Sequence, residues 1–275
     1  MLKQRLLTAG ILIPLFLWLV LAAPTSLVAL ALAGVLLLGA REWAALYHWS
    51  EQQQLRFMLA LSALAFVAYL GRGAAPFIVI YTFFATLLWA AIAAWLWRHR
   101  MQTVPETDVF LQRLRSSGFV VGLIVLTPCF AALVWLHNMP TNGPRVMMFC
   151  LSLLWVADSA AYFAGRRFGK NKLAPAVSPG KTWEGLVGAW IAVTLWAWLG
   201  GNLFSVPLGG FGFLLLCWLS LAYSVVGDLW ESQIKRLFHA KDSGTLLPGH
   251  GGVLDRIDSA TAGAPVFALG YWWLS

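Results

Sequence analysis

Charged residues gather in one short stretch near the C-terminal end of a chain that has few of them. The stretch 232–258 carries seven charged residues, although only 11% of the 275 residues are charged. They are the basic Lys235, Arg236, Lys241 and Arg256 and the acidic Asp242, Asp255 and Asp258. Basic side chains bind phosphate oxygens, and carboxylates bind a hard cation that bridges to the same phosphates. The stretch therefore predicts a phosphate site at a membrane, with an ordinary solvated loop as the alternative.

The same stretch contains a turn with little side-chain bulk, Pro248-Gly249-His250-Gly251-Gly252. A ligand can approach such a backbone closely and meet free N–H donors, so Gly251 and Gly252 are candidate substrate-binding residues. Two interpretations of His250 stay open, a contact to phosphate and a loop residue beside two glycines.

A second candidate phosphate element lies upstream, at Ser178-Pro179-Gly180-Lys181-Thr182. Its end is similar to a Walker A loop, but the first glycine of that motif would fall at Pro175 and no strand is expected before it. We therefore reject a P-loop. A Gly-Lys-Thr turn that opens a helix still presents N–H groups and positive charge suited to a phosphate.

Carboxylates inside or beside apolar runs form the third group of candidates. Such a carboxylate is costly in a membrane unless it is paired or bound to a cation, so a functional role is expected. Asp228 falls on one helix face with Glu231 and Lys235, at positions i, i+3 and i+7. Asp158 allows a second interpretation, a structural network with Arg166 two turns further along the helix.

Asp255 and Asp258 are three residues apart at the expected start of the last helix, where the helix dipole favours their ionised forms. Asp228 lies at the end of the preceding helix. Two helix ends thus direct carboxylates at one place, which predicts a metal site formed by Asp228, Asp255 and Asp258.

The elements that must position these residues are membrane helices, because 60% of the residues are hydrophobic. A bilayer core of about 30 Å requires roughly 20 apolar residues in a helix. Nine candidate runs are found. They are Leu6–Ala23, Ser26–Ala40, Phe57–Leu70, Pro76–Trp97, Phe119–Leu136, Val146–Ala164, Leu186–Phe204, Phe211–Leu229 and Ser259–Leu274. We predict an all-α integral membrane protein, a polytopic bundle of about nine transmembrane helices whose cytoplasmic loops form the active site.

The basic residues predict the orientation of this bundle. With a cytoplasmic N-terminus, the inside segments are 1–5, 41–56, 98–118, 165–185 and 230–258, which hold two, two, four, five and four Lys or Arg residues. Those are 17 of the 19 in the chain, as the positive-inside rule requires. We expect a multi-pass protein of the inner (cytoplasmic) membrane with its C-terminus outside. The net charge of +8 then faces anionic lipid and phosphate ligands, and no nucleic acid is expected.

Other features are expected to be structural. The first apolar run is interpreted as an uncleaved helix, since it is long for a secretory signal. Trp43 and Tyr47 are expected to be interfacial anchors. The three cysteines lie inside apolar runs and are expected to pack there. We divide the chain into an N-terminal transmembrane region, 1–118, and a C-terminal catalytic region, 119–275, with the signature at 232–258.

The signature stretch resembles that of the phosphatidate cytidylyltransferases (CDP-diacylglycerol synthases). Their pattern is Ser-x-aliphatic-Lys-Arg, four residues, Lys-Asp, a small residue, an apolar residue before Pro or Gly, His-Gly-Gly and Asp-Arg-x-Asp. The matching residues are Ser232, Ile234, Lys235, Arg236, Lys241, Asp242, Gly244, Leu247, Pro248, His250, Gly251, Gly252, Asp255, Arg256 and Asp258. The family also has a similar Ser-Pro-x-Lys-Thr element, matched by Ser178, Lys181 and Thr182, which we assign to CTP or phosphatidate.

The resemblance implies an enzyme that converts CTP and phosphatidate to CDP-diacylglycerol and pyrophosphate. The expected catalytic residues are Asp228, Lys235, Arg236, Lys241, Asp255 and Arg256. The resemblance supports Asp228 and Asp255 as ligands of Mg²⁺. Asp258 is expected to be either a further ligand or a group that contacts the ligands, and a second cation is left open. Expected partners are CTP, phosphatidate and membrane lipid, and a homodimer is left open.

Two alternatives belong to other groups of proteins. A CDP-alcohol phosphotransferase needs an Asp-Gly pair, which the chain lacks. An ion-coupled transporter would place its acidic residues near the bilayer midplane on broken helices. Here most acidic residues sit at helix ends beside basic loops, which favours the enzyme.

Overall fold

The computed structural model describes every residue except 1, 100–108, 208, 245 and 247–250. Its elements are α1 (Leu2–Leu21), α2 (Thr25–Leu46), α3 (Glu51–Leu70), η1 (Gly71–Gly73), α4 (Ala75–Arg98), α5 (Val109–Ser116), α6 (Gly118–His137), α7 (Gly143–Phe168), β1 (Lys172–Ala174), β2 (Ser178–Thr182), α8 (Trp183–Leu203), α9 (Gly210–Leu237) and α10 (Leu254–Leu274). His250 lies outside the described residues.

The predicted all-α membrane fold is confirmed. In the described part of the chain, nine helices have 20 to 28 residues, and each contains most of one predicted apolar run. Seven of them, α2, α3, α4, α6, α7, α8 and α9, are long and apolar enough to cross a membrane by length and composition. The chain is therefore a polytopic, multi-pass membrane protein.

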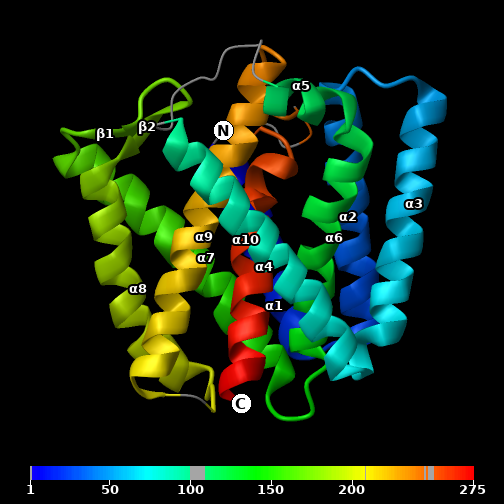
Figure 1. Ribbon diagram of the computed structural model, residues 1–275. Coiled ribbons are helices and arrows are strands. Elements are labelled where there is room, and N and C mark those ends of the chain that lie inside the picture. Colours follow the sequence, from blue (N-terminus) through cyan, green and yellow to red (C-terminus); the bar gives the residue numbers. More distant parts are fainter. Residues whose placement is uncertain (1, 100–108, 208, 245, 247–250) are drawn as a thin grey trace.

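Successive long helices run in opposite directions, so the connections predicted to be basic gather at one end of the bundle (Figure 1). This end carries the α2–α3 connection, α5, the β1–β2 hairpin and the facing ends of α9 and α10. We call it the basic end. The marks for the two chain termini lie toward opposite ends of the bundle, as an odd number of crossings requires.

Four helices extend at least five residues further into polar sequence than their apolar runs predict. The helix α2 continues to Leu46, α3 begins at Glu51, α9 continues to Leu237, and α10 begins at Leu254. Polar contacts at some of these helix ends support the extensions. Ser50, for example, caps α3 in a capping box with Gln53, and such a pair satisfies two otherwise unpaired N–H groups.

The helix α10 lies at the centre of the bundle and packs against α9, α6 and α4 (Figure 1). Buried residues of both predicted regions belong to one hydrophobic core. Three tryptophans join the regions. Trp43 of α2 stacks on Trp230 of α9 with ring centroids 5.9 Å apart, and Trp89 of α4 meets Trp230 edge-on at 5.6 Å. The N-terminal helices therefore support the C-terminal ones directly.

The predicted interfacial role of Trp43 and Tyr47 is wrong, because both side chains are buried. Trp43 is 2% exposed, and its Nε1 donates to the carbonyl of Gly118 at 3.0 Å. The Tyr47 hydroxyl donates to the carbonyl of Leu114 at 3.3 Å. These aromatic side chains lie inside the bundle because each polar atom finds a backbone acceptor there. The three cysteines are free and buried, as expected of packing residues.

Candidate active site

The Ser-Pro-Gly-Lys-Thr element forms one strand of a small hairpin at the basic end. Strand β2 pairs antiparallel with β1, with Lys172 opposite Thr182. This corrects the expectation of a turn without a strand. Thr182 then caps α8, because its Oγ1 accepts from the N–H of Gly185 at 3.1 Å. The cap fixes the start of α8, and with it the direction of the preceding Lys181.

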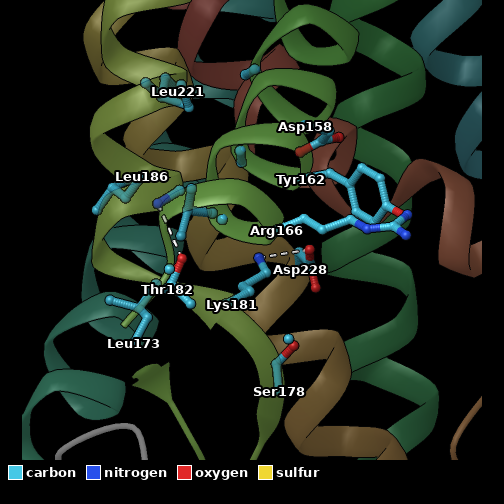
Figure 2. Close-up of a pocket in the computed structure, with 18 of the residues that line it drawn as sticks. Asp158, Tyr162, Arg166, Leu173, Ser178, Lys181, Thr182, Leu186, Leu221 and Asp228 are labelled. Atoms are coloured by element: carbon cyan, nitrogen blue, oxygen red, sulfur yellow. Dashed lines mark hydrogen bonds and ion pairs between the residues drawn. The ribbon is translucent and has the colours of Figure 1, made fainter. Parts of the chain in front are cut away.

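A pocket of about 660 Å³ opens between this hairpin, α7, α8, α9 and the start of α10. Its polar lining residues are Asp158, Tyr162, Arg166, Lys172, Ser178, Lys181, Thr182, Asp228, Asp255, Arg256 and Asp258. Its apolar lining includes Leu173, Leu186, Leu221 and Val225. Figure 2 shows Ser178 and Leu221 at opposite ends of the pocket, with Lys181, Asp228 and Asp158 between them.

An ion pair between Lys181 and Asp228 crosses the pocket (Figure 2). The Nζ of Lys181 lies 2.6 Å from Oδ2 of Asp228, and the two side chains are 23% and 27% exposed. Both groups are therefore accessible to a ligand. Oδ1 of Asp228 also accepts a long hydrogen bond, 3.4 Å, from the Ser232 hydroxyl one turn along α9. The structure thus brings a predicted phosphate ligand and a predicted metal ligand into contact.

Asp158 is held by α10, and Arg166 contacts a different residue. The carboxylate of Asp158 accepts from the Ser259 hydroxyl at 3.0 Å. Arg166 instead donates to the hydroxyl of Tyr162 at 3.0 Å, one turn back on α7. Asp158 therefore adds a fourth carboxylate to the pocket wall, beside Asp228, Asp255 and Asp258.

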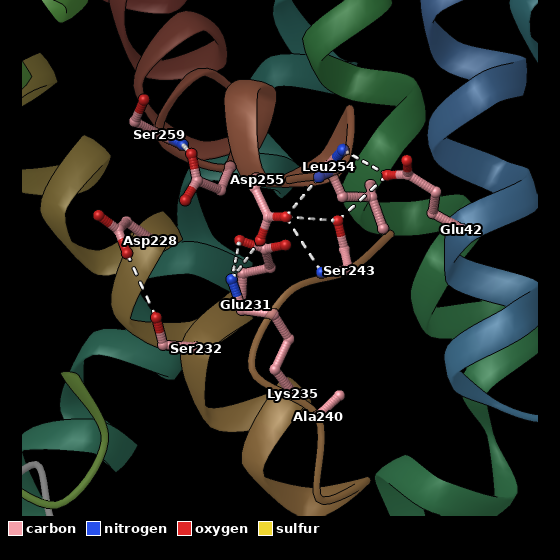
Figure 3. Close-up of polar contacts among 12 residues, drawn as sticks. Glu42, Asp228, Glu231, Ser232, Lys235, Ala240, Ser243, Leu254, Asp255 and Ser259 are labelled. Carbon is pink, nitrogen blue, oxygen red and sulfur yellow. Dashed lines mark hydrogen bonds and ion pairs between the residues drawn. The ribbon is translucent and has the colours of Figure 1, made fainter. Parts of the chain in front are cut away.

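Asp255 ties the signature loop to α9 (Figure 3). Its Oδ1 accepts from Nζ of Lys235 at 2.6 Å. Its Oδ2 accepts from the N–H of Ser243 at 3.0 Å and from the N–H of Gly252 at 2.8 Å, and it lies 3.0 Å from the Ser243 hydroxyl, whose one proton it shares with Glu42. Oδ2 is thereby saturated. Oδ1 accepts from Lys235 and retains acceptor capacity for a cation.

Lys235 is buried, 8% exposed, between two carboxylates. Besides Asp255 it contacts Oε2 of Glu231 at 3.2 Å, one turn back on α9. A buried charge is tolerated when it is paired and hydrogen-bonded in this way. Lys235 therefore lies behind the pocket wall, where it orients Asp255, and is not itself among the lining residues.

The structure brings together eight of the predicted site residues on the wall of one pocket. They are Ser178, Lys181, Thr182, Asp228, Asp255, Arg256, Asp258 and the carboxylate candidate Asp158. The described pocket wall does not include Arg236, Lys241, Gly251 or Gly252.

Two of these outlying residues have identifiable surroundings. Arg236 donates to the carbonyls of Val177 and Ala240 at 3.4 and 3.1 Å, which joins the β1–β2 connection to the end of α9. The N–H of Gly252 is bonded to Asp255, which corrects the expectation that this donor is free for a ligand. Lys241 is exposed. A role in substrate binding stays a prediction for Arg236, Lys241, Gly251 and Gly252.

The sequence reasoning missed Glu42, which is 7% exposed although it is charged. Its carboxylate accepts from the N–H groups of Val253 and Leu254 and from the hydroxyl of Ser243 (Figure 3). The available signal was a carboxylate beside an apolar run, the same signal that identified Asp228. Its partner loop, about 200 residues away in sequence, could not be deduced from spacing.

The carboxylates on the pocket wall fit a magnesium ion. Mg²⁺ prefers oxygen ligands and is usually held by one or two carboxylates together with substrate phosphates. Among the described residues, no group of three or more His, Cys, Asp or Glu side chains is arranged to hold a metal by itself. A site completed by a ligand's phosphates therefore suits the donor set of Asp228, Asp258 and Oδ1 of Asp255.

Comparison with known proteins agrees with this geometry. The chain matches the model of the Cytidylyltransferase family over residues 3–274. It is 41% identical to a phosphatidate cytidylyltransferase of Pseudomonas aeruginosa, over 99% of this chain and 97% of that protein. A protein of the same name from Haemophilus influenzae is 36% identical over the whole of both chains, and one from Bacillus subtilis is 36% identical over 52% of this chain and 53% of its own length. The resemblance carried by the signature is confirmed, and the chain belongs to the cytidylyltransferase family.

Proposed function

We propose that the protein is a phosphatidate cytidylyltransferase, which converts CTP and phosphatidate to CDP-diacylglycerol and pyrophosphate. The observation that carries the proposal is a single pocket in which cationic side chains and carboxylates face one another beside an apolar wall. The full-length relatives of the same name support the choice of substrates.

In this reaction an oxygen of the phosphatidate phosphate attacks the α-phosphorus of CTP. A bond forms between that oxygen and the α-phosphorus, and the bond from the α-phosphorus to the bridging oxygen breaks, releasing pyrophosphate. The nucleophile is already an anion, so no general base is required, and the protein contributes positioning and charge neutralisation. Lys181 and Arg256 lie where they can hold phosphate oxygens, and Lys181 can exchange its carboxylate partner for a phosphate.

Asp228, Asp255 and Asp258 are the residues that would hold Mg²⁺. When bound, the ion would neutralise charge on the phosphates of CTP and on the leaving pyrophosphate. Asp228 reaches this place from inside α9, because the helix continues past it to Leu237 and does not end near Leu229 as the sequence predicts. Asp255 and Asp258 reach it from the first turns of α10. Lys235 keeps Asp255 ionised and oriented through the 2.6 Å contact.

The apolar wall suits the lipid substrate. Leu221 precedes Asp228 by seven residues on α9, which is about 10 Å along a helix axis at 1.5 Å per residue. The pocket therefore extends from the polar end of the bundle toward the depth of the acyl chains. We propose that the phosphate of phosphatidate lies near Lys181 while the acyl chains remain among apolar side chains.

Purified protein in detergent is expected to convert phosphatidate to CDP-diacylglycerol in a reaction that needs both CTP and Mg²⁺. Production of labelled CDP-diacylglycerol from radiolabelled CTP measures the reaction directly, and omission of phosphatidate is the control. If the protein binds CTP but makes no CDP-diacylglycerol with any phosphatidate tested, the proposed activity is wrong although the family assignment holds.

The orientation of the bundle gives a further expected outcome. We propose that the basic end faces the cytoplasm of a cell with this protein in its inner membrane, which places Ser275 outside. A reporter that is active only in the cytoplasm should be inactive when fused after Ser275 and active when fused after Leu237, at the basic end. Activity of the first fusion would contradict the proposed orientation.

A further inference from the structure

Glu42, on the helix α2, contacts the signature loop and the start of α10 at the same time (Figure 3). Its Oε1 accepts from the N–H of Val253 at 2.9 Å. Its Oε2 accepts from the N–H of Leu254 at 2.8 Å and from the Ser243 hydroxyl at 3.1 Å. Both oxygens of this buried carboxylate are therefore used by the segment that carries Asp255.

These contacts satisfy backbone groups that α10 cannot satisfy itself. The first N–H groups of a helix have no partner within the helix, and a negative charge at this end is favourable. Gly252, Val253 and Leu254 are consecutive, and their three N–H groups all point to carboxylates, the first to Asp255 and the others to Glu42. The start of α10 is thus held from two sides, by α2 and by its own first turn.

Ser243 connects the two carboxylates. Its hydroxyl lies 3.1 Å from Oε2 of Glu42 and 3.0 Å from Oδ2 of Asp255. The hydroxyl has one proton and can donate to one oxygen at a time, while the N–H of Ser243 stays on Asp255 at 3.0 Å. A displacement of Glu42 is therefore transmitted to Asp255 through Ser243 and through the backbone of 252–254.

Two glycines of the signature are explained by the same carboxylate. A Cβ on Gly244 would lie 2.6 Å from Oε1 of Glu42, and a Cβ on Gly252 would lie 2.5 Å from Oε2. Such distances are too short for a real side chain. The loop can close around Glu42 because these positions lack side chains.

The position of Glu42 itself is fixed by its neighbour on α2. Trp43 stacks on Trp230 of α9, and its Nε1 is bonded to the carbonyl of Gly118. The end of α2 is therefore immobilised against the helices that carry the pocket.

We propose that Glu42 is a positioning residue for the reaction, which holds Asp255 at the pocket by anchoring the signature loop and the start of α10. The inference rests on the proposed function for its kinetic effect. Glu42 lies in the region predicted to be separate from the catalytic one, and it does not line the pocket.

Glu42→Gln is the informative substitution because it keeps the shape and removes the charge and one acceptor. The amide nitrogen would face an N–H of Val253 or Leu254, so one of these two contacts is lost. We expect kcat/KM to fall about 10- to 100-fold, the usual effect when a group that orients a metal ligand is changed. The apparent Mg²⁺ requirement should rise as well, since Asp255 is the group displaced. Glu42→Asp, which keeps both oxygens on a shorter side chain, should recover part of the loss.

Two control variants separate positioning from general stability. Glu51→Gln makes the same chemical change at an exposed position in the first turn of α3, and its kinetics should match those of the wild type. Trp89→Phe removes the 3.1 Å hydrogen bond from Nε1 to the carbonyl of Thr261, which also joins an N-terminal helix to α10. It should lower thermal stability without changing the Mg²⁺ requirement of the folded enzyme.

Amide hydrogen exchange, followed by mass spectrometry on the folded protein in detergent, gives a readout that does not depend on activity. Exchange should be faster in 251–258 for Glu42→Gln and unchanged there for Glu51→Gln. If Glu42→Gln only lowers thermal stability, with wild-type kinetics and exchange, the proposal is overturned. If the wild type makes no CDP-diacylglycerol, the proposed function fails while the exchange experiment still decides whether Glu42 anchors the loop.

Discussion

Asp228→Asn is expected to lower kcat/KM by about 10²- to 10³-fold, the usual loss when one preorganised charge is removed from a transition state. The substitution removes a carboxylate that faces the pocket and leaves Lys181 without its 2.6 Å partner. Most of the loss should appear in kcat, and a higher Mg²⁺ concentration should restore part of it. Initial rates across a Mg²⁺ titration, with CTP and phosphatidate near saturation, measure both effects.

The matched comparison for this variant is Asp158→Asn, which makes the same change on the same pocket wall. Asp158 accepts a hydrogen bond from Ser259 of α10, so one of its oxygens already has a donor. We expect a smaller loss for Asp158→Asn and little change in the Mg²⁺ requirement. Near-wild-type activity of Asp228→Asn together with an inactive Asp158→Asn would transfer the proposed metal role to Asp158.

Asp255→Asn should lower kcat/KM about as much as Asp228→Asn does. The double variant should have a kcat/KM only slightly lower than that of either single variant. If the two carboxylates serve one cation, removal of either disables the site, so the losses do not multiply. Asp255→Asn should also loosen the signature loop, because an amide cannot accept from both Lys235 and the three donors on Oδ2. Activity of the four proteins, each shown to be monodisperse in detergent, completes the cycle.

Ser243→Ala is the control for the loosening effect. It removes one hydrogen bond to Asp255 but leaves the N–H contact and the charge. We expect kcat/KM to fall at most about tenfold, which is the scale of one hydrogen bond to a charged group. Multiplying losses in the double Asp228→Asn/Asp255→Asn variant would show that the two carboxylates act separately.

The membrane helices could be predicted from the sequence because apolar runs of the required length report burial in lipid directly. Phe119–Leu136 and Pro76–Trp97, for example, differ from α6 and α4 by one residue at each end. The predicted end of a helix is wrong where a charged residue is paired inside the bundle. The apolar run predicts an end of α2 before Glu42, whereas the bonds from Glu42 to the start of α10 allow the helix to continue to Leu46.

The candidate site could be predicted as far as local sequence specifies it. The signature brought Asp255, Arg256 and Asp258 to one helix start, and the Ser-Pro-Gly-Lys-Thr element supplied Lys181. Spacing places Glu231 and Lys235 on one helix face, but which basic residue meets an acid of another element depends on how the helices pack. The side chain of Lys235 has the charge and the donors of a phosphate ligand, but packing buries it between Glu231 and Asp255.

The pocket that runs from Ser178 to Leu221 determines how the reaction rate depends on the amount of the lipid substrate. A site that takes a lipid while its acyl chains remain in the bilayer responds to the mole fraction of that lipid in the membrane plane, and not to its amount per volume of solution. Adding detergent or inert lipid at fixed protein and phosphatidate then slows turnover by surface dilution, whereas CTP, which arrives from water at the basic end, keeps an ordinary volume-based KM. A cell that expands its membrane without making more phosphatidate lowers the mole fraction of this lipid, and thereby lowers the rate of the reaction.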